Sequence, residues 1–358
     1  MINIFKIIIY SKWIFKKPNE KNVLVYDSHS EEFAKIFFLK KNYEILNVRY
    51  ESINIYVLFV TFLKSGIKNL QDNYKKNYME FVSPKIVLTA IDNNPAFYKL
   101  KNIYDKPYYI SFQNWQRDNK FYNECKSYIK ETKENLRADF IFLFNEVEKK
   151  KLSKVIKSKI YVTGNVKNNH YSIKNKIRDK ITNIMYVSQH RPNISFLETD
   201  KKIFNYLINF CKKRNIKLSF CTPQKKEYEV FFRNNLNRGD WIFYHYVNPR
   251  KTYTNLNKQQ MVVFNYSSLG FEALAKGIKC VSFAKSFPTY GYKKKYPKSG
   301  PFWTNSLNYH DMNKIILRIF NLKNLKWKKI SKKYSHEILN YDPNNSIAKK
   351  TIREILKK

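Results

Sequence analysis

The chain has 358 residues, of which 68 are Lys or Arg and 28 are Asp or Glu, so its formal net charge is +40. Hydrophobic residues make up 43% and aromatic residues 17% of the sequence, which excludes an intrinsically disordered chain and predicts a globular protein of about two domains. The charge is typical of nucleic-acid or membrane-surface binding, but lysine is spread over the whole length, so we favour compositional bias as its cause.

Cysteine spacing and apolar runs indicate where the chain works. The four cysteines lie far apart and form no CxxC pair: Cys125, Cys211, Cys221 and Cys280. They predict neither a disulfide framework nor a zinc site, but buried thiols in a reducing compartment. The run 55–63 is too short to span a membrane, and residues 1–17 lack the pattern of a secretory signal. We expect both to be buried core, with an interfacial helix at 1–17 as the alternative, in a cytoplasmic protein that is either free or peripheral on the inner membrane.

Short apolar runs alternate with lysine-rich helical stretches over residues 1–165. The runs predicted as strands are 22–27, 43–48, 86–90, 108–112, 140–144 and 160–163. They are almost continuously apolar rather than alternating, which predicts strands buried on both faces of a parallel sheet. We therefore interpret residues 1–165 as an N-terminal Rossmann-like domain.

The polar segment 166–182 carries almost no strand signal and is predicted to be a linker. The pattern then starts again over 183–325, with strands predicted at 183–188, 217–222, 261–265 and 279–284. The range 326–358 is predicted to be a helical tail. Two α/β halves joined by a linker predict two Rossmann-like domains that face a cleft, in which ligands bind at the carboxyl ends of the strands.

The helix after the strand 261–265 carries the most informative signal. Ser267, Ser268 and Gly270 open this helix, and Glu272 lies one turn into it. Small residues at a helix N-terminus leave N–H groups for a phosphate, and Glu272 can accept hydrogen bonds from a ribose diol. An ordinary N-cap, with Glu272 interacting with the helix dipole, explains the same residues equally well.

The stretch SSLGFEALAKGIKCVSF resembles the donor-nucleotide segment of GT-B glycosyltransferases and of the related non-hydrolysing sugar-nucleotide epimerases. Together with it, five further segments resemble glycosyltransferase-like surface-carbohydrate biosynthesis proteins of bacterial O-antigen and capsule loci: IVLTAIDNNPAFYKL (86–100), ISFQNWQRDNKFY (110–122), YVTGNVKNN (161–169), VSQHRP (187–192) and GPFW (300–303). Trp115 departs from the pattern, because it stands where a glycine is expected.

The resemblance implies a GT-B fold with C-terminal helices and an enzyme that moves a sugar from a nucleotide-sugar donor to an O-antigen, capsule or lipopolysaccharide acceptor. It also implies chemistry without a metal or a cofactor, so that cationic side chains and helix N-termini neutralise the leaving phosphate. The donor residues predicted in the second domain (183–325) are His190, Arg191, Ser267, Ser268, Gly270 and Glu272.

The first domain would hold the acceptor and, if the reaction inverts the anomeric centre, the catalytic base. Asp92 is the predicted base because it follows the strand 86–90 at its carboxyl end, although an ordinary Asp-Asn-Asn-Pro turn explains it too. His29, which follows the first strand, is the second choice. The predicted acceptor-binding residues are Asn93, Asn94, Gln113, Asn114 and Arg117.

Other interpretations stay open. A sugar-nucleotide epimerase-like or glycerol-phosphate transferase-like reaction would use the same fold. A basic nucleic-acid-binding protein is the alternative from another class, but the sequence has no zinc finger, RNP-like motif or basic region with heptads. The predicted partners are a nucleotide-sugar donor, a glycan or lipid-linked acceptor and an anionic membrane surface, with no specific nucleic acid.

Overall fold

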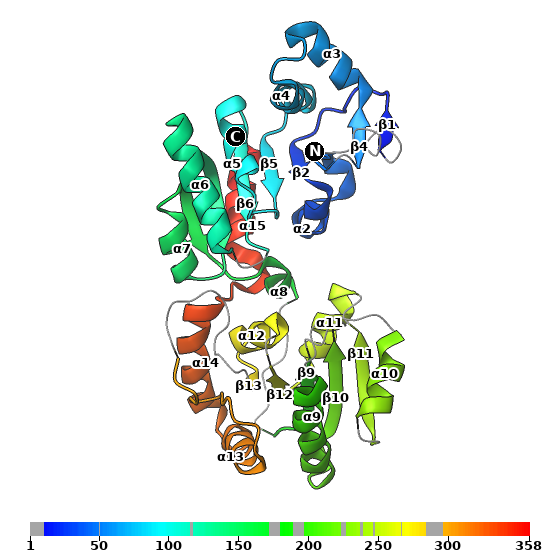
Figure 1. Ribbon diagram of the computed structural model, residues 1–358, viewed down its shortest axis with the longest axis vertical. Coiled ribbons are helices and arrows are strands. Elements are labelled where there is room, and N and C mark those ends of the chain that lie inside the picture. The colour runs from blue at the N-terminus through cyan, green and yellow to red at the C-terminus, as the bar shows by residue number, and fades with distance from the viewer. Residues whose placement is uncertain are drawn as a thin grey trace. The chain divides into compact units, whose positions relative to one another are not determined.

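The computed structural model describes residues 11–49, 51–114, 117–171, 180–188, 197–222, 227–236, 239–245, 248–265, 267–283 and 296–358. The chain forms two compact units (Figure 1): unit 1 consists of Met1–Val166 and Asn345–Lys358, and unit 2 of Lys167–Asn344. None of the described helices combines the length and the apolar character that crossing a bilayer requires. The four cysteines are buried, as predicted.

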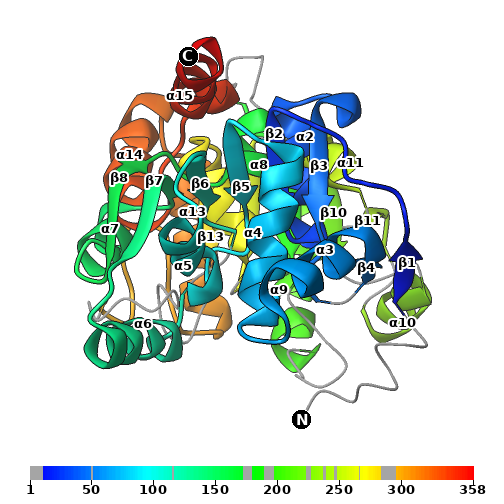
Figure 2. The same ribbon diagram turned by 90° about the horizontal axis from the view of Figure 1, so that it is seen from above.

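Unit 1 is built on a six-stranded parallel sheet with the strand order β3-β2-β5-β6-β7-β8 (Figure 2). Its strands are β2 (Val23–Tyr26), β3 (Tyr43–Leu46), β5 (Ile86–Thr89), β6 (Tyr108–Phe112), β7 (Leu136–Leu143) and β8 (Ile156–Val162). Each strand predicted in this half of the chain is present. Every residue of β2 and β5 is buried, which confirms that the central strands are covered on both faces.

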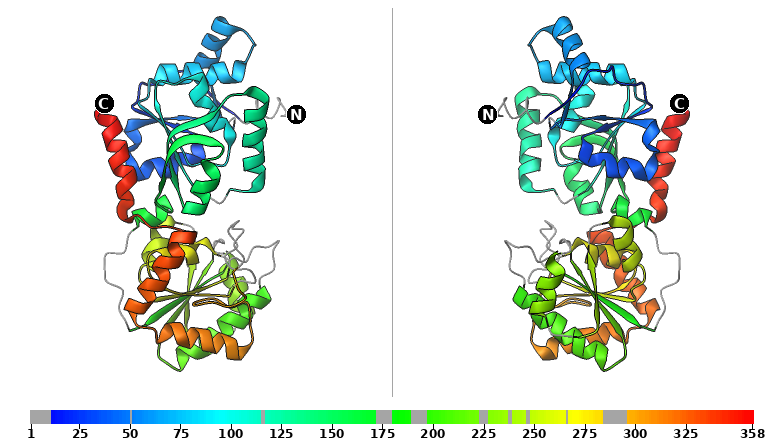
Figure 3. Two further views of the ribbon diagram at one scale, coloured as in Figure 1. Left: turned by 90° about the vertical axis from the view of Figure 1, so that its left-hand side faces the viewer. Right: turned by 90° about the vertical axis from the view of Figure 1, so that its right-hand side faces the viewer.

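Helices cover both faces of this sheet (Figure 3). The helices of unit 1 are α2 (Glu31–Phe37), α3 (Ile55–Ser65), α4 (Leu70–Val82), α5 (Pro95–Ile103), α6 (Asn119–Thr132), α7 (Glu146–Leu152) and α15 (Ser346–Lys357). Ala348, Ile352 and Ile355 of α15 pack in the same core as α2, so the end of the predicted helical tail belongs to the first unit. The short helix α8 (Val166–His170) begins where the linker was predicted.

Two expectations for the N-terminal part are wrong. Residues 12–17 were expected to be buried core, but Trp13 and Phe15 are exposed. The alternative of an interfacial helix does not hold there either, because the strand β1 (Lys12–Ile14) pairs in parallel with β4 (Ser52–Asn54); residues 1–10 lie outside the described residues. The run 55–63, expected to be buried, forms most of α3 and leaves Phe59 and Phe62 exposed. The reason is that α3 packs on α4 through Val57, Thr61 and the ring of Tyr56, which contacts the ring of Phe81, whereas Phe59 and Phe62 lie outside this contact.

Unit 2 contains a five-stranded parallel sheet with the order β11-β10-β9-β12-β13. Its strands are β9 (Asn183–Val187), β10 (Lys217–Thr222), β11 (Trp241–His245), β12 (Met261–Phe264) and β13 (Lys279–Ser282). Its helices after α8 are α9 (Leu197–Lys212), α10 (Glu227–Asn235), α11 (Pro249–Leu256), α12 (Ser268–Ala275), α13 (Tyr309–Phe320) and α14 (Asn324–Ile338). The edge strand β11 was not predicted.

The predicted fold class is confirmed, since both units are α/β with a parallel sheet. In each sheet the first strand lies between the second strand and a later one: β2 between β3 and β5, and β9 between β10 and β12. The strand order therefore reverses beside β2 and beside β9. Open α/β sheets bind ligands at the carboxyl ends of the strands at such points. The candidate sites are therefore the carboxyl ends of β2 and β5, which we call the β2–β5 edge, and the carboxyl ends of β9 and β12, which we call the β9–β12 edge.

Candidate functional site

Hydrogen bonds tie the loops after β2 and β5 together in unit 1. The Ser30 hydroxyl accepts the N–H of Ala90 at 2.8 Å and lies 3.3 Å from the Thr89 hydroxyl. His29 and Asp92, the two predicted bases, thus follow neighbouring strands at one edge of the sheet. The loop after β6 joins them, because the N–H of Asn114 donates to Oδ1 of Asp92 at 3.0 Å.

A histidine–aspartate pair lies directly after β2. Nδ1 of His29 is 3.1 Å from Oδ1 of Asp27, and the side chains are 59% and 2% exposed. When Nδ1–H donates to this carboxylate, Nε2 keeps the lone pair that can take a proton. Asp27 has φ 76°, a strained conformation for a non-glycine residue, and its Oδ1 also accepts the backbone N–H of His29 at 2.9 Å.

Arg49 and Glu51 extend this pair. Nε of Arg49 lies 2.6 Å from Oδ2 of Asp27, and its backbone N–H donates to Glu51. Among the described residues, Asp27, His29 and Glu51 make up the one group of three side chains with metal-ligand atoms within 4.8 Å of one another. A guanidinium already neutralises Asp27, so this arrangement disfavours a metal ion and favours an oriented imidazole.

Asp92 is buried in an ion pair. Its Oδ2 lies 2.5 Å from Nη2 of Arg117, and both side chains are almost fully excluded from solvent. Burial raises the pKa of Asp92 to about 6, although Arg117 and the N–H of Asn114 act in the opposite direction. Nη1 of Arg117 lies 3.5 Å from Glu148, which accepts the Tyr122 hydroxyl at 2.8 Å. The structure thus unites two predicted site residues inside unit 1.

The other predicted acceptor-binding residues divide into structural and exposed groups. Oε1 of Gln113 accepts the N–H of Phe144 at 2.8 Å, which links the ends of β6 and β7. Asn94 is the N-cap of α5 and accepts the N–H of Ala96 at 2.9 Å. Asn93 and Asn114 are exposed at the same edge.

In unit 2, His190 and Arg191 lie outside the described residues, as does Trp115 of unit 1. Ser267 is the N-cap of α12, because its hydroxyl accepts the N–H of Leu269 at 3.2 Å. A Cβ at Gly270 would lie 2.2 Å from the ring of Phe264, so glycine permits α12 to pack closely on β12. Ser268 is partly exposed at the start of the helix.

Glu272 is buried and accepts the Tyr253 hydroxyl at 2.6 Å. Burial raises the pKa of Glu272 to about 7, and the Tyr253 hydrogen bond lowers it only in part. Burial also lowers the pKa of Lys276 to about 8, and its ammonium donates to the Tyr171 carbonyl at 2.6 Å and to Asn257 at 2.8 Å. A ribose at this carboxylate would share it with Tyr253 or displace that hydroxyl.

Sequence reasoning missed three polar residues at the carboxyl edge of the second sheet. Thr222 ends β10 and Asn265 follows β12; both are buried, and Oγ1 and Oδ1 have no hydrogen-bond partner within the described part of the chain. Asp200 of α9 accepts the hydroxyls of Tyr186 and Ser188, each at 2.5 Å, and burial raises its pKa to about 6. Thr222 and Asn265 could have been found from the sequence, because both stand at the ends of predicted strands.

Residues 110–356 match the model of a family described as "putative O-antigen biosynthesis protein". The chain belongs to this family. No curated protein sequence matches the chain.

Solved structures share the fold at low identity. The UDP-GlcNAc 2-epimerase of Methanocaldococcus jannaschii has a TM-score of 0.54 and 12% identity, over 94% of this chain and 99% of that one. The UDP-GlcNAc 2-epimerase of Neisseria meningitidis bound to UDP-GlcNAc has a TM-score of 0.53 and 13% identity, over 94% and 99%. The wall teichoic acid polymerase TagF has a TM-score of 0.53 and 13% identity, over 96% and 90%. These similarities establish a GT-B-like fold for this member of the O-antigen family.

The two edges offer complementary chemistry. The β2–β5 edge of unit 1 carries an exposed imidazole held by a buried carboxylate, which is suited to proton transfer. The β9–β12 edge of unit 2 carries a capped helix N-terminus beside polar atoms without partners among the described residues, which is suited to an anionic, hydroxyl-rich ligand.

Proposed function

We propose that this protein is a glycosyltransferase that moves a sugar from a nucleotide donor to a glycan or lipid-linked acceptor of surface polysaccharide synthesis. The observation that carries the proposal is the His29–Asp27 pair at the β2–β5 edge of unit 1. Nε2 of His29 takes the proton of the acceptor hydroxyl while the oxygen bonds to the anomeric carbon. The bond from that carbon to the donor phosphate breaks, and the nucleotide leaves with the electron pair.

The geometry favours His29 over Asp92 as the base. A base must reach the acceptor hydroxyl within hydrogen-bonding distance. His29 is exposed. Asp92 is buried and lies 2.5 Å from the guanidinium of Arg117, so it would have to break this ion pair to reach the acceptor. We therefore assign Asp92 and Arg117 to positioning, because Asp92 accepts the N–H of Asn114 and so fixes the loop after β6. Asn93 and Asn114 are the exposed residues left for acceptor hydroxyls.

Unit 2 is proposed to bind the donor. The N-terminus of α12, with Ser267 and Ser268, would receive a donor phosphate, and Glu272 would accept a ribose hydroxyl. Asn265 and Thr222 would offer the nucleotide or the sugar their side-chain oxygens, which have no hydrogen-bond partner among the described residues. His190 and Arg191 keep their predicted role in neutralising the leaving phosphate. None of these roles requires a metal or a cofactor.

A thermal-shift panel of UDP-, GDP- and CMP-sugars tests donor binding. We expect one nucleotide class to raise the melting temperature, because a ligand that binds only the folded state stabilises it. If none does, the donor proposal fails. Transfer is then measured as nucleotide release in the presence of a lipid extract that contains the acceptor.

The His29→Gln variant tests the base. We expect it to reduce transfer by about 10² to 10⁴-fold while the donor-induced rise in melting temperature persists, since this imidazole has no proposed contact with the donor. His310→Gln, at an exposed histidine of α13 in unit 2, is the matched control and should retain full activity. Unchanged transfer in His29→Gln would exclude this residue as the base.

An epimerase-like reaction is the second candidate, because UDP-GlcNAc 2-epimerases are among the solved structures that share the fold. Product analysis separates the two. Transfer releases the nucleotide, whereas epimerisation keeps it attached to an isomeric sugar that incorporates solvent deuterium at the inverted carbon. A glycerol-phosphate transferase-like reaction on the same fold would add a glycerol phosphate to the acceptor instead of a sugar, and the mass of the product distinguishes the two.

A further inference from the structure

Helix α3 of unit 1 exposes its large apolar side chains. Tyr56, Phe59, Phe62 and Leu63 of this helix and Ile67 just after it are between 38% and 78% exposed. The side chains that α3 buries are smaller and partly polar: Val57 and Thr61, whose hydroxyl accepts a hydrogen bond from Asn77 of α4 at 2.9 Å. A helix of a soluble domain normally buries its apolar side and exposes its polar side, and α3 does the reverse.

The exposed side chains form one continuous surface. Tyr56, Phe59 and Leu63 follow the spacing of residues on one face of a helix. Strand β1 packs beside α3 and adds Phe15, which is 74% exposed, and the partly exposed Trp13. In Figures 1 and 3 the α3–α4 pair projects from the sheet of unit 1. We call this surface the α3 face; it consists of Trp13, Phe15, Tyr56, Phe59, Phe62, Leu63 and Ile67.

Exposed lysines border the α3 face. Lys64 lies in the last turn of α3, where its ammonium is 3.5 Å from Glu80 of α4, and Lys68 follows the helix. Lys12 begins β1, and Lys16 and Lys17 follow this strand. In residues 11–21 and 52–82 lysines outnumber acidic residues. Large apolar side chains bordered by cations fit a surface that offers an apolar layer beneath negative charge, as anionic phospholipids do. A second copy of this chain would instead bring lysines against lysines.

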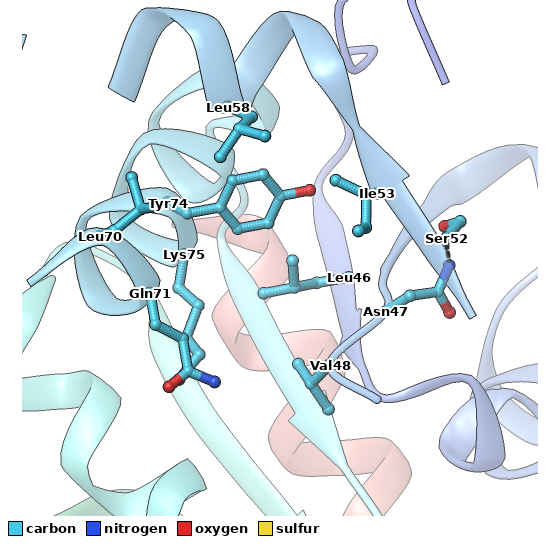
Figure 4. A pocket seen from close by; sticks show the side chains of 10 residues that line it. All are labelled: Leu46, Asn47, Val48, Ser52, Ile53, Leu58, Leu70, Gln71, Tyr74 and Lys75. Carbon is cyan, nitrogen blue, oxygen red and sulfur yellow. Dashed lines mark hydrogen bonds between the residues drawn. The ribbon is translucent and has the colours of Figure 1, made fainter. Parts of the chain in front are cut away.

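An apolar pocket lies beside the α3 face (Figure 4). It has a volume of about 290 Å³, and its apolar lining comes from β3, β4, α3, α4 and their connections: Leu46, Val48, Ile53, Leu58, Leu70 and Tyr74. Leu58 of α3 points into this pocket, while the next residue, Phe59, is 60% exposed. Helix α3 therefore contributes apolar side chains to this pocket as well as to the exposed surface.

We propose that the α3 face docks unit 1 on a bilayer that contains anionic phospholipid. Phe59, Phe62 and Leu63 insert at the boundary between headgroups and acyl chains, and the bordering lysines contact the phosphates. The inference goes beyond sugar transfer and does not depend on it. It also assigns a role to part of the net charge.

Vesicle co-sedimentation of the full chain tests the proposal, with vesicles of phosphatidylcholine alone or mixed with phosphatidylglycerol. We expect binding to the mixed vesicles and much weaker binding to phosphatidylcholine. The double variant F59Q/F62Q should bind mixed vesicles at least about tenfold more weakly, because it loses the inserting rings. The control V230Q/L325Q removes two equally exposed apolar side chains of unit 2 and should bind like the wild type.

The lysines supply a second readout. K64Q/K68Q should weaken binding at low salt by about tenfold, and this difference from the wild type should shrink at high salt, since salt screens exposed charges. All substituted positions are exposed, so the circular dichroism melting curves of the variants should match that of the wild type.

Three results would overturn the proposal. The first is a wild type that does not bind mixed vesicles; if a variant without residues 1–10 then binds them, the N-terminal segment is what covers the α3 face. The second is equal binding of F59Q/F62Q and the wild type. The third is a wild-type dimer that F59Q/F62Q converts to a monomer, which would make the α3 face a self-association surface. Because vesicle binding needs no donor, any of these leaves the glycosyltransferase proposal standing.

Discussion

Buried carboxylates are compensated in different ways at the two candidate edges. In unit 1 the partner is a guanidinium: Asp27 lies 2.6 Å from Arg49, and Asp92 lies 2.5 Å from Arg117. Such a pair is fixed before any ligand arrives, and for Asp92 the guanidinium opposes the rise in pKa that burial causes. The cations of this edge therefore already face carboxylates of the same unit, and the exposed ring of His29 is left to act on a ligand.

In unit 2 the partners are hydroxyls. Asp200 accepts those of Tyr186 and Ser188, and Glu272 accepts that of Tyr253. Because a hydroxyl lowers the pKa less than burial raises it, Asp200 reaches about 6 and Glu272 about 7. The pKa of Asp92 in unit 1 also reaches about 6, so the two units differ in the kind of partner and not in the direction of the shift. Unit 1 thus has a preassembled edge of ion pairs, and unit 2 an edge at which neutral hydroxyls hold the buried carboxyls.

Removal of Arg117 tests the preassembled edge and has the largest expected effect. Arg117→Leu leaves Asp92 and Glu148 buried without their cation, so we expect the free energy of unfolding to fall by about 3–5 kcal/mol. Urea unfolding followed by circular dichroism measures it. The control Arg233→Leu, at an exposed ion pair with Glu229, should change stability by less than about 1 kcal/mol.

A second variant tests whether the loss of stability comes from the uncompensated charge or from the different shape of leucine. Adding Asp92→Asn to Arg117→Leu removes one of the uncompensated charges and should restore part of the lost stability. If Arg117→Leu costs no more than Arg233→Leu, the carboxylates of unit 1 do not rely on this cation, and the contrast between the units fails.

Glu272→Gln tests the pH response of unit 2. The pKa of Glu272 is raised from 4.5 to about 7 by burial, so the folded state binds more protons than the unfolded state between these values. The stabilisation from protonated Glu272 is full below pH 4.5 and is lost as the pH rises to 7, by about 3 kcal/mol. The glutamine side chain of the variant cannot ionise, so the variant should lose less stability between about pH 5 and pH 7 than the wild type does.

Urea unfolding at several pH values measures this difference. Glu198→Gln, at an exposed carboxylate of α9, is the control and should follow the wild-type pH dependence. Parallel curves for Glu272→Gln and the wild type would show that burial does not raise the pKa of Glu272 in the folded state.

Local patterns predicted the sheets but not what depends on distant packing. Apolar runs such as 23–26 and 86–89 predicted the central strands, because strands buried on both faces need such runs. Strand β11 was missed because an edge strand is only half covered, and Ile242 within it is exposed. The packing of α15 in unit 1 could not be predicted, since an amphipathic helix does not specify which sheet it covers.

The same limit applies to the candidate sites. The strand-end rule identified Asp92 and Arg117, but their pairing depends on how the loop after β6 folds back, which no local pattern encodes. Gly270 was predicted from a phosphate-binding pattern, whereas its closest neighbour is the ring of Phe264. Residue type and position predicted where polar groups gather, and only the packing decided which of them face one another.

Thr222→Val tests whether the uncharged polar atoms at the β9–β12 edge of unit 2 bind a ligand. Of the variants proposed here, it should change the stability of the ligand-free protein least. The Thr222 hydroxyl is buried, with no hydrogen-bond partner among the described residues. Valine has almost the same shape and no polar group to desolvate, so the ligand-free variant should be as stable as the wild type or up to about 1 kcal/mol more stable. The melting temperature with and without a nucleotide sugar measures both states.

Thr61→Val in α3 is the matched change in unit 1. The Thr61 hydroxyl donates to the Val57 carbonyl at 2.7 Å and accepts from Asn77, so its loss should destabilise the protein by about 1–2 kcal/mol. The donor-induced rise in melting temperature should shrink in Thr222→Val and persist in Thr61→Val. If instead both variants lose the same stability without ligand, the Thr222 hydroxyl stabilises the ligand-free protein. It is then not available to bind a ligand at the β9–β12 edge.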